Sequence, residues 1–130
     1  MKLSSKILEE VTKGACDSPR LRMNYNLHES FDDIVQRMFN ALEPGTYVPI
    51  ARHPNSNETL IMIRGKLRVK IYDCNLNETE NVIIAPNSEF IGYHIPKGTW
   101  HRVESLEHGT ICFETREGPY VPVAECDIIK

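Results

Sequence analysis

The chain has 130 residues, a length that normally folds as one domain around one hydrophobic core. Its formal net charge is -3 and it has no basic run, which argues against nucleic acid as a partner. It also has no apolar run long enough to span a membrane and no secretory leader, so we expect a cytoplasmic protein without membrane contact.

The cysteines are widely spaced and include no CxxC pair, which excludes a zinc-finger fold. In a reducing compartment we expect them to be free thiols, mostly buried as small apolar residues. They are Cys16, Cys74, Cys112 and Cys126.

Two helices are predicted in the N-terminal third of the chain. Residues 4–13 place Ile7, Leu8 and Val11 on one helical face, and Gly14 is a plausible end. Residues 31–42 contain the clearest helical spacing of apolar side chains in the sequence.

The second predicted helix also has a typical start. Ser30 and Asp33 resemble a capping box, and Glu43-Pro44-Gly45 follows as a stop. The segment between the two helices, residues 18–30, is polar and has no helical period, so it is either a solvated loop or an edge strand.

From Tyr47 onward the sequence has the character of an antiparallel β-protein. Short apolar runs alternate with turn signals and no helix lies between them, which favours a sandwich or barrel. After residue 117 we expect an edge strand or an arm. The predicted strands are 46–53, 58–64, 66–73, 81–84, 89–95, 100–106 and 110–116. We therefore expect residues 1–44 to pack on a barrel formed by residues 45–130, as one structural domain.

His53 and Glu58 are the first candidate functional pair. An uninterrupted strand would point them to opposite faces, but residues 54–57 form a loop that allows both to face one cavity. Imidazole and carboxylate together suit a divalent transition metal such as zinc, iron, nickel, manganese or cobalt.

Two motifs resemble those of the cupin superfamily. The first runs from Gly45 to Gly65 in the register Gly, five residues, His-x-His, four residues, Glu, six residues, Gly. The second, Pro-x-Gly-x-x-His, ends at His101. The resemblance implies an all-β cupin double-stranded β-helix (jelly roll). The helical spacing of apolar residues predicts two helices N-terminal to it. The resemblance also implies that His53, Glu58 and His101 bind one divalent transition metal.

The chain departs from the first cupin motif at one ligand position. Ala51 stands where the motif has its first histidine, and alanine cannot bind a metal. His94, on the strand that enters the Pro96 turn, is a candidate replacement if it faces inward. A water molecule is the alternative ligand, and a surface position for His94 is also open.

The sequence also resembles the WbuC family of small cupins, found in bacterial surface-polysaccharide gene clusters. The resemblance spans residues 18–120 and is carried by the segments SPRLRMNYNLH, VQRMFNALEPGTYV, RHPNSNETLIMIRG, IPKGTWHRVESLE and FETREGPY. It implies a link to O-antigen or capsule biosynthesis and an anionic sugar or nucleotide-sugar as the ligand.

The polar segment after the first helix is a candidate ligand-binding lid. Arginine is well suited to bind carboxylate or phosphate in a bidentate manner, and the segment would select an anion if it folds over the barrel mouth. The candidate substrate-binding residues are Arg20, Arg22, Asn24, His28 and Tyr120.

Glu114 is the candidate catalytic residue. It is placed to act as a general acid or base beside a metal-bound substrate, or to form a salt bridge at the barrel rim. Our leading hypothesis is a metal-binding cupin that acts on or senses a small anionic carbohydrate, and in an enzymatic version isomerisation or epimerisation is the natural reaction class. A ligand-binding cupin without turnover, a metal-dependent dioxygenase and a metal-free sugar epimerase are the alternatives. Exposed sheet edges favour a homodimer.

Overall fold

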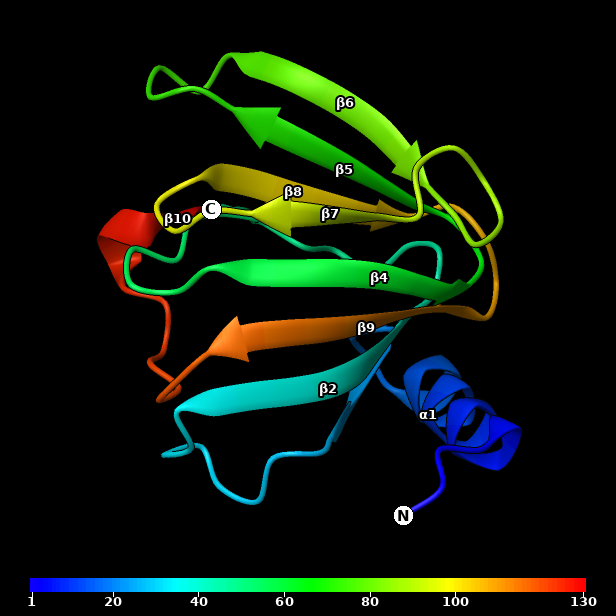
Figure 1. Cartoon of the computed structure of the whole chain (residues 1–130). Helices are drawn as coiled ribbons and strands as arrows, with labels where there is room; N and C mark the ends of the chain where they lie inside the picture. Colours follow the sequence, from blue (N-terminus) through cyan, green and yellow to red (C-terminus); the bar gives the residue numbers. More distant parts are fainter.

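The computed structural model describes all 130 residues and is built around two antiparallel five-stranded sheets (Figure 1). The first sheet contains, in spatial order, β1 (Arg22–Asn26), β2 (Val35–Leu42), β9 (Thr110–Glu117), β4 (Glu58–Arg64) and β7 (Gly92–Ile95). The second sheet contains β10 (Ile128–Ile129), β3 (Ile50–Ala51), β8 (Trp100–Ser105), β5 (Leu67–Tyr72) and β6 (Glu78–Ile84).

The main hydrophobic core lies between the two sheets. Its buried side chains come from the inward-facing positions of both sheets, as expected when apolar residues alternate along strands. They are Leu42, Leu60, Met62, Leu67, Val69, Ile84, Ile95 and Cys112. The predicted antiparallel β-architecture is confirmed, and each predicted strand after residue 45 overlaps a strand of the structure.

A single helix, α1 (Ser5–Asp17), covers part of the outer face of the first sheet (Figure 1). It buries Val11 and Ala15 against β2 and β9. Gly14 does not end the helix, which continues to Asp17. Gly14 instead faces Met23 of β1, where an added Cβ would lie 3.1 Å from the Met23 Cγ. No helix in the structure is both long and apolar enough to cross a membrane.

The helix predicted over residues 31–42 is wrong, so the chain has one N-terminal helix instead of two. Residues 35–42 form β2, and Asp33 accepts hydrogen bonds from the backbone N–H groups of Glu29 and Ser30 in the turn before it. β2 is covered on both faces. Phe39 and Ala41 pack towards α1, whereas Gln36, Met38, Asn40 and Leu42 line the interior cavity.

This double coverage explains the error. A strand that is buried on both faces loses the alternation of apolar and polar residues, and its apolar residues then imitate helical spacing. Of the two alternatives for residues 18–30, the edge strand is the one that forms: β1 lies at the edge of the first sheet and pairs with β2.

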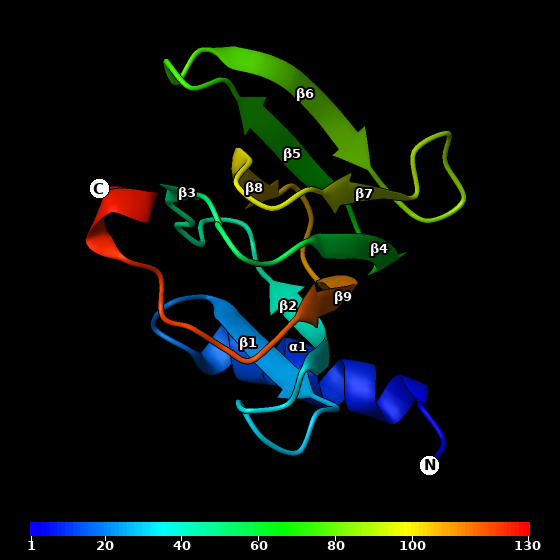
Figure 2. The ribbon, with the colours of Figure 1, turned by 60° about the vertical axis from the view of Figure 1, so that its left-hand side comes forward.

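The C-terminal segment connects the two sheets at their open end. The chain leaves the first sheet at the end of β9 and reaches the second sheet as η1 (Glu125–Asp127) and β10, which pairs with β3. Figure 2 shows this segment, coloured orange to red, between the end of β9 and the C-terminus. Tyr120 is held there by its N–H, which donates to the Phe31 carbonyl over 2.7 Å.

We expect Phe39→Ala to lower the free energy of unfolding by about 3–5 kcal/mol, because it empties the space between β2 and α1. Val35→Ala is the matched control in the same strand, since Val35 is 44% exposed and Phe39 only 5%. In a helix these two residues, four positions apart, would share the apolar face. Urea denaturation of both variants measures the difference, and equal losses would contradict the strand assignment.

Candidate metal and ligand site

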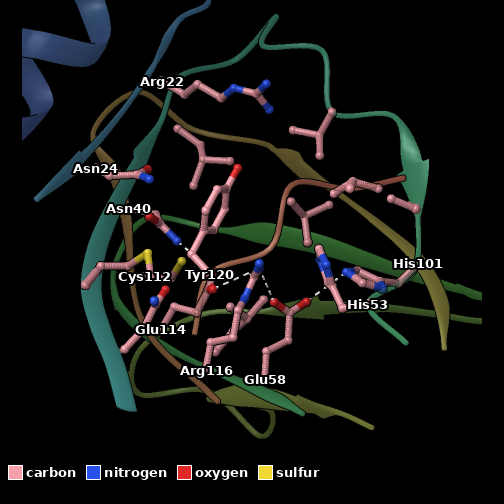
Figure 3. A pocket seen from close by; sticks show the side chains of 18 of the residues that line it. Arg22, Asn24, Asn40, His53, Glu58, His101, Cys112, Glu114, Arg116 and Tyr120 are labelled. Carbon is pink, nitrogen blue, oxygen red and sulfur yellow. Dashed lines mark hydrogen bonds and ion pairs between the residues drawn. The ribbon is translucent and has the colours of Figure 1, made fainter. Parts of the chain in front are cut away.

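The two sheets enclose a cavity of about 650 Å³. Its walls come from β1, β2, β4, β8 and β9, together with the segment that leads into β1 and the C-terminal segment. Figure 3 shows Asn24, Asn40 and Glu114 along one side of the cavity and His53 and His101 along the other. The cavity is therefore polar on two opposing walls.

His53, Glu58 and His101 converge in this cavity, as the sequence predicts. One potential donor atom from each of the three residues lies within 4.8 Å of the others. The Nε2 of His101 is 2.8 Å from the Oε1 of Glu58, and the centroids of the two imidazole rings are 5.6 Å apart. Glu58 and His101 are buried, and His53 is half-buried.

The loop between β3 and β4 places His53 and Glu58 on the same cavity. β3 ends at Ala51, which pairs with His101 in β8, and His53 follows in the loop. The His53 carbonyl accepts a hydrogen bond from the N–H of Gly98 over 2.9 Å. The loop is thereby attached to the turn that precedes His101.

Asn57 holds the other end of this loop. Its Oδ1 accepts the N–H of Lys97 over 2.9 Å, and its Nδ2 donates to the carboxylate of Glu117. Because Lys97 precedes β8 and Glu117 ends β9, Asn57 fixes the start of β4 to both neighbouring elements. The break at residues 54–57 is thus an ordered connection.

His101 has the hydrogen bond that orients a metal-binding imidazole. Its Nδ1 lies 2.8 Å from the carbonyl oxygen of Thr99, which can only accept, so Nδ1 carries a proton. In the neutral ring the lone pair is then on Nε2, which faces Glu58. A ligand histidine held through its other nitrogen is the usual arrangement in metal sites. The two imidazoles and one carboxylate fit a divalent transition metal.

Burial and the neighbouring charges set the protonation of these histidines. Burial, helped by the positive charge of Arg116, lowers the pKa of His53 to about 4. Burial also acts to lower the pKa of His101, but the hydrogen bond to the Glu58 carboxylate outweighs it and raises that pKa. At neutral pH His53 therefore offers a free nitrogen lone pair.

Arg116 is a site residue that the sequence interpretation missed. It lies opposite Glu58 in the β4–β9 pairing, and its Nη2 is 2.5 Å from the Oε2 of Glu58. The same Nη2 lies 3.0 Å from the Oε2 of Glu114. The signal was present in the sequence, because Arg116 is two residues from Glu114 and a strand puts such residues on one face.

The two buried carboxylates have opposite pKa shifts. Burial acts to raise the pKa of Glu58, but the hydrogen bond from His101 and the charge of Arg116 outweigh it and hold the pKa at about 2. Burial and the charge of Glu58 raise the pKa of Glu114 to about 7. Asn40 donates to the Oε1 of Glu114 over 2.9 Å. Glu114 is therefore a carboxyl group able to hold or release a proton near neutral pH.

All candidate substrate-binding residues line this cavity: Arg20, Arg22, Asn24, His28 and Tyr120. His94 does not join them. It is exposed on β7, where its Nδ1 lies 2.9 Å from the Oγ1 of Thr59. Thr59 and its strand partner His94 face outward because Glu58 faces inward. Its position therefore does not support His94 as the replacement for the histidine missing at position 51.

The structure has the fold of cupin proteins, as comparison with solved structures indicates. KdgF from a Halomonas species is similar at a TM-score of 0.62 and 14% identity, over 81% of this chain and 85% of that chain. CapF, a capsular polysaccharide assembling protein of Staphylococcus aureus, matches at a TM-score of 0.68 and 19% identity, over 81% of this chain but only 28% of CapF. The cupin domain of Schizosaccharomyces pombe Cnp3 matches at a TM-score of 0.59 and 9% identity, over 74% and 64%.

The chain belongs to the family described as domain of unknown function DUF6016, whose model matches residues 3–84. That match includes α1, β1 to β6 and two of the three predicted metal ligands. Comparison with curated proteins gives no significant match.

Glu114→Gln tests the raised pKa of Glu114. The native state keeps this proton to about pH 7, whereas an ordinary carboxyl loses it near 4.5, so ionisation of Glu114 costs native stability as the pH rises through that window. Glutamine cannot ionise. The stability of the variant relative to the wild type should therefore increase between about pH 5 and about pH 8, by more than the roughly 1.4 kcal/mol of one pKa unit.

Urea denaturation of both proteins across this pH range gives the two stability curves. Subtracting them cancels the contribution of the titrating groups that lie away from Glu114. A difference that does not change with pH would show that Glu114 has an ordinary pKa.

Proposed function

We propose that this protein is a metal-binding cupin whose ligand is a small anionic carbohydrate such as a nucleotide-sugar. The reaction that we propose for an enzymatic role is isomerisation or epimerisation of this ligand. One observation carries the proposal. Five buried polar side-chain atoms have no hydrogen-bond partner, and all five belong to residues that line the same cavity: Arg22 Nε, His28 Nε2, Asn40 Oδ1, Glu114 Oε2 and Arg116 Nε.

Such atoms are unfavourable unless a ligand or water satisfies them. The set contains guanidinium donors from two arginines, a ring nitrogen of a histidine, and oxygens from an amide and a carboxyl group. Glu114 Oε2 lies near Arg116, but the two are not aligned for a hydrogen bond. Sugar hydroxyl groups both donate and accept, so they match a wall in which donors and acceptors alternate.

The anionic part of the ligand is assigned to the end of the cavity near β1. Arg20 and Arg22 both line this end, and no acidic side chain pairs with either of them. Phosphate and carboxylate groups suit guanidinium groups in this state. Tyr120 and Phe31, with ring centroids 5.1 Å apart, also line the cavity, and both side chains are exposed on their other side.

His53, Glu58 and His101 are the residues that would hold the metal. A bound divalent ion polarises a carbonyl or hydroxyl oxygen of the substrate. Arg116 keeps the Glu58 carboxylate in place through Oε2, so Oε1 stays directed at the two histidines. Isomerases and epimerases move a proton between substrate atoms, and Glu114 has the pKa for this task near neutral pH.

The link to bacterial surface polysaccharides rests on similarity. The WbuC-like segments cover residues 18–120, and one structural neighbour is a capsular polysaccharide assembling protein. On this basis we place the protein in the cytoplasm, in O-antigen or capsule biosynthesis. We also propose a single-domain homodimer, because β1, β6, β7 and β10 are free sheet edges.

A binding cupin without a metal is the second candidate. The observation in its favour is that His101 and Arg116 satisfy both oxygens of Glu58 without any ion. Ala51 removes one ligand, and the charge of Arg116 opposes a second positive charge nearby. In this version the cavity holds the carbohydrate through its polar walls alone.

Elemental analysis of protein purified without chelator or nickel affinity separates these candidates. We expect His101→Ala to lose one equivalent of transition metal relative to the wild type, because three protein ligands become two. His94→Ala, which alters an exposed histidine outside the cavity, should retain the wild-type content. Equal metal content in wild type and His101→Ala would refute the barrel metal site and leave the metal-free binding protein.

Thermal-shift titration with a panel of nucleoside-diphosphate sugars tests the ligand class. Arg22→Ala should weaken binding of the best ligand about 10-fold or more, because a hydrogen bond to a charged group contributes about 1.5–3 kcal/mol. Arg37→Ala is the control, since this exposed arginine lies on β2 outside the cavity. If neutral hexoses bind as well as the nucleotide-sugars, the anionic part of the proposal is wrong.

A further inference from the structure

A second group of metal-ligating side chains lies outside the cavity. It contains Cys16 in the last turn of α1, Glu43 directly after β2, and His108 in the turn between β8 and β9. One potential donor atom from each residue lies within 4.8 Å of the others. None of these residues lines the ligand cavity, so the group is independent of the proposed function.

Glu43 is the fixed centre of this group. The residue is buried, and its Oε2 accepts the backbone N–H of Gly109 over 2.7 Å. Its own backbone N–H donates to the carbonyl of Leu21 over 2.9 Å. Both ends of the residue are therefore held by the fold, and only Oε1 remains for other partners.

Cys16 and His108 both approach that one oxygen. The Sγ of Cys16 lies 3.1 Å from Oε1, and the Nδ1 of His108 contacts the same atom. Both side chains are exposed on the other side, so solvent and ions can reach the group. A thiol, an imidazole and a carboxylate from three separate segments thus share one point that is open to solvent.

We propose that Cys16, Glu43 and His108 form a second metal site, for zinc or an ion of similar preference. Thiolate sulfur, imidazole nitrogen and carboxylate oxygen are the donor atoms that zinc and cobalt accept together. Three protein donors leave one coordination position for water. On binding, the thiol of Cys16 gives its proton to solvent and the sulfur coordinates as thiolate.

The position of this site gives it a structural consequence. A metal bound there joins the C-terminal end of α1 to the end of β2 and to the β8–β9 turn. Without a metal, the same residues form only hydrogen bonds to Glu43. Metal binding to the native state therefore stabilises the docked helix by mass action.

Titration of the full-length apo-protein with Co²⁺ tests the proposal. Coordination of cobalt by a thiolate produces a sulfur-to-metal charge-transfer absorption in the near ultraviolet, which the N and O donors of the barrel site cannot give. We expect the band in the wild type and its loss in Cys16→Ser. His108→Ala, at an exposed position, should also weaken it and serves as the second variant.

Two controls separate this site from other sources of the signal. Cys126→Ser removes another exposed thiol and should keep the band, whereas His101→Ala removes a barrel ligand and should also keep it. Circular dichroism confirms that each variant is folded. Absence of the band in the wild type at excess Co²⁺, or its persistence in Cys16→Ser, would overturn the proposal. Metal loss from the barrel site of His101→Ala, as measured by elemental analysis, does not change the cobalt band expected from Cys16, Glu43 and His108.

Zn²⁺ provides an independent readout through stability. It should raise the melting temperature of the wild type by more than that of Cys16→Ser, in which only the barrel site can still bind the ion, and it should still raise that of His101→Ala. An equal rise in Cys16→Ser and in the wild type would place the stabilising zinc elsewhere and contradict the proposed ligands.

Discussion

The Glu58 carboxylate is the charge around which the interior is arranged. A buried carboxylate is strongly unfavourable unless positive or hydrogen-bonding groups surround it. Glu58 receives His101 at one oxygen and Arg116 at the other. Because β4 and β9 belong to the first sheet and β8 to the second, the His101 contact joins the two sheets beside the cavity, whereas the Arg116 contact lies within the first sheet. The same group therefore contributes to both the fold and the site.

The two carboxylate oxygens of Glu58 have different partners, and this difference relates the two candidate functions. Arg116 occupies Oε2 in either case, whereas Oε1 is shared between His101 and any ion that enters. An ion at Oε1 has to displace the proton on the Nε2 of His101, so protonation and metal binding compete there. Ala51, the strand partner of His101, lines the cavity at the position where the cupin motif has its first histidine.

The sequence was sufficient for the strands and for the His53, Glu58 and His101 convergence, because strand alternation and cupin spacing both report on these positions. The prediction from sequence failed for residues 31–42. Because α1 covers the outer face of β2, that face is apolar and lacks the polar residues that usually indicate a strand. Cys16, Glu43 and His108 are separated by at least 27 residues: the β2–β9 pairing brings Glu43 and His108 together, and the docking of α1 adds Cys16. A contact of this kind has no periodic signal. Arg116 did have one, since it is on the same strand face as Glu114.

β2 has a central role because its two faces serve different sites. Its inner face supplies Asn40, which holds Glu114 in the cavity, and its outer face supplies Phe39 for α1. Glu43 follows directly and receives the N–H of Gly109, the residue before β9. The β2–β9 ladder is therefore fixed at Glu43 and again at Glu114. Because α1 covers the outer side of this ladder, the helix supports the cavity wall that presents the proposed proton-transfer residue.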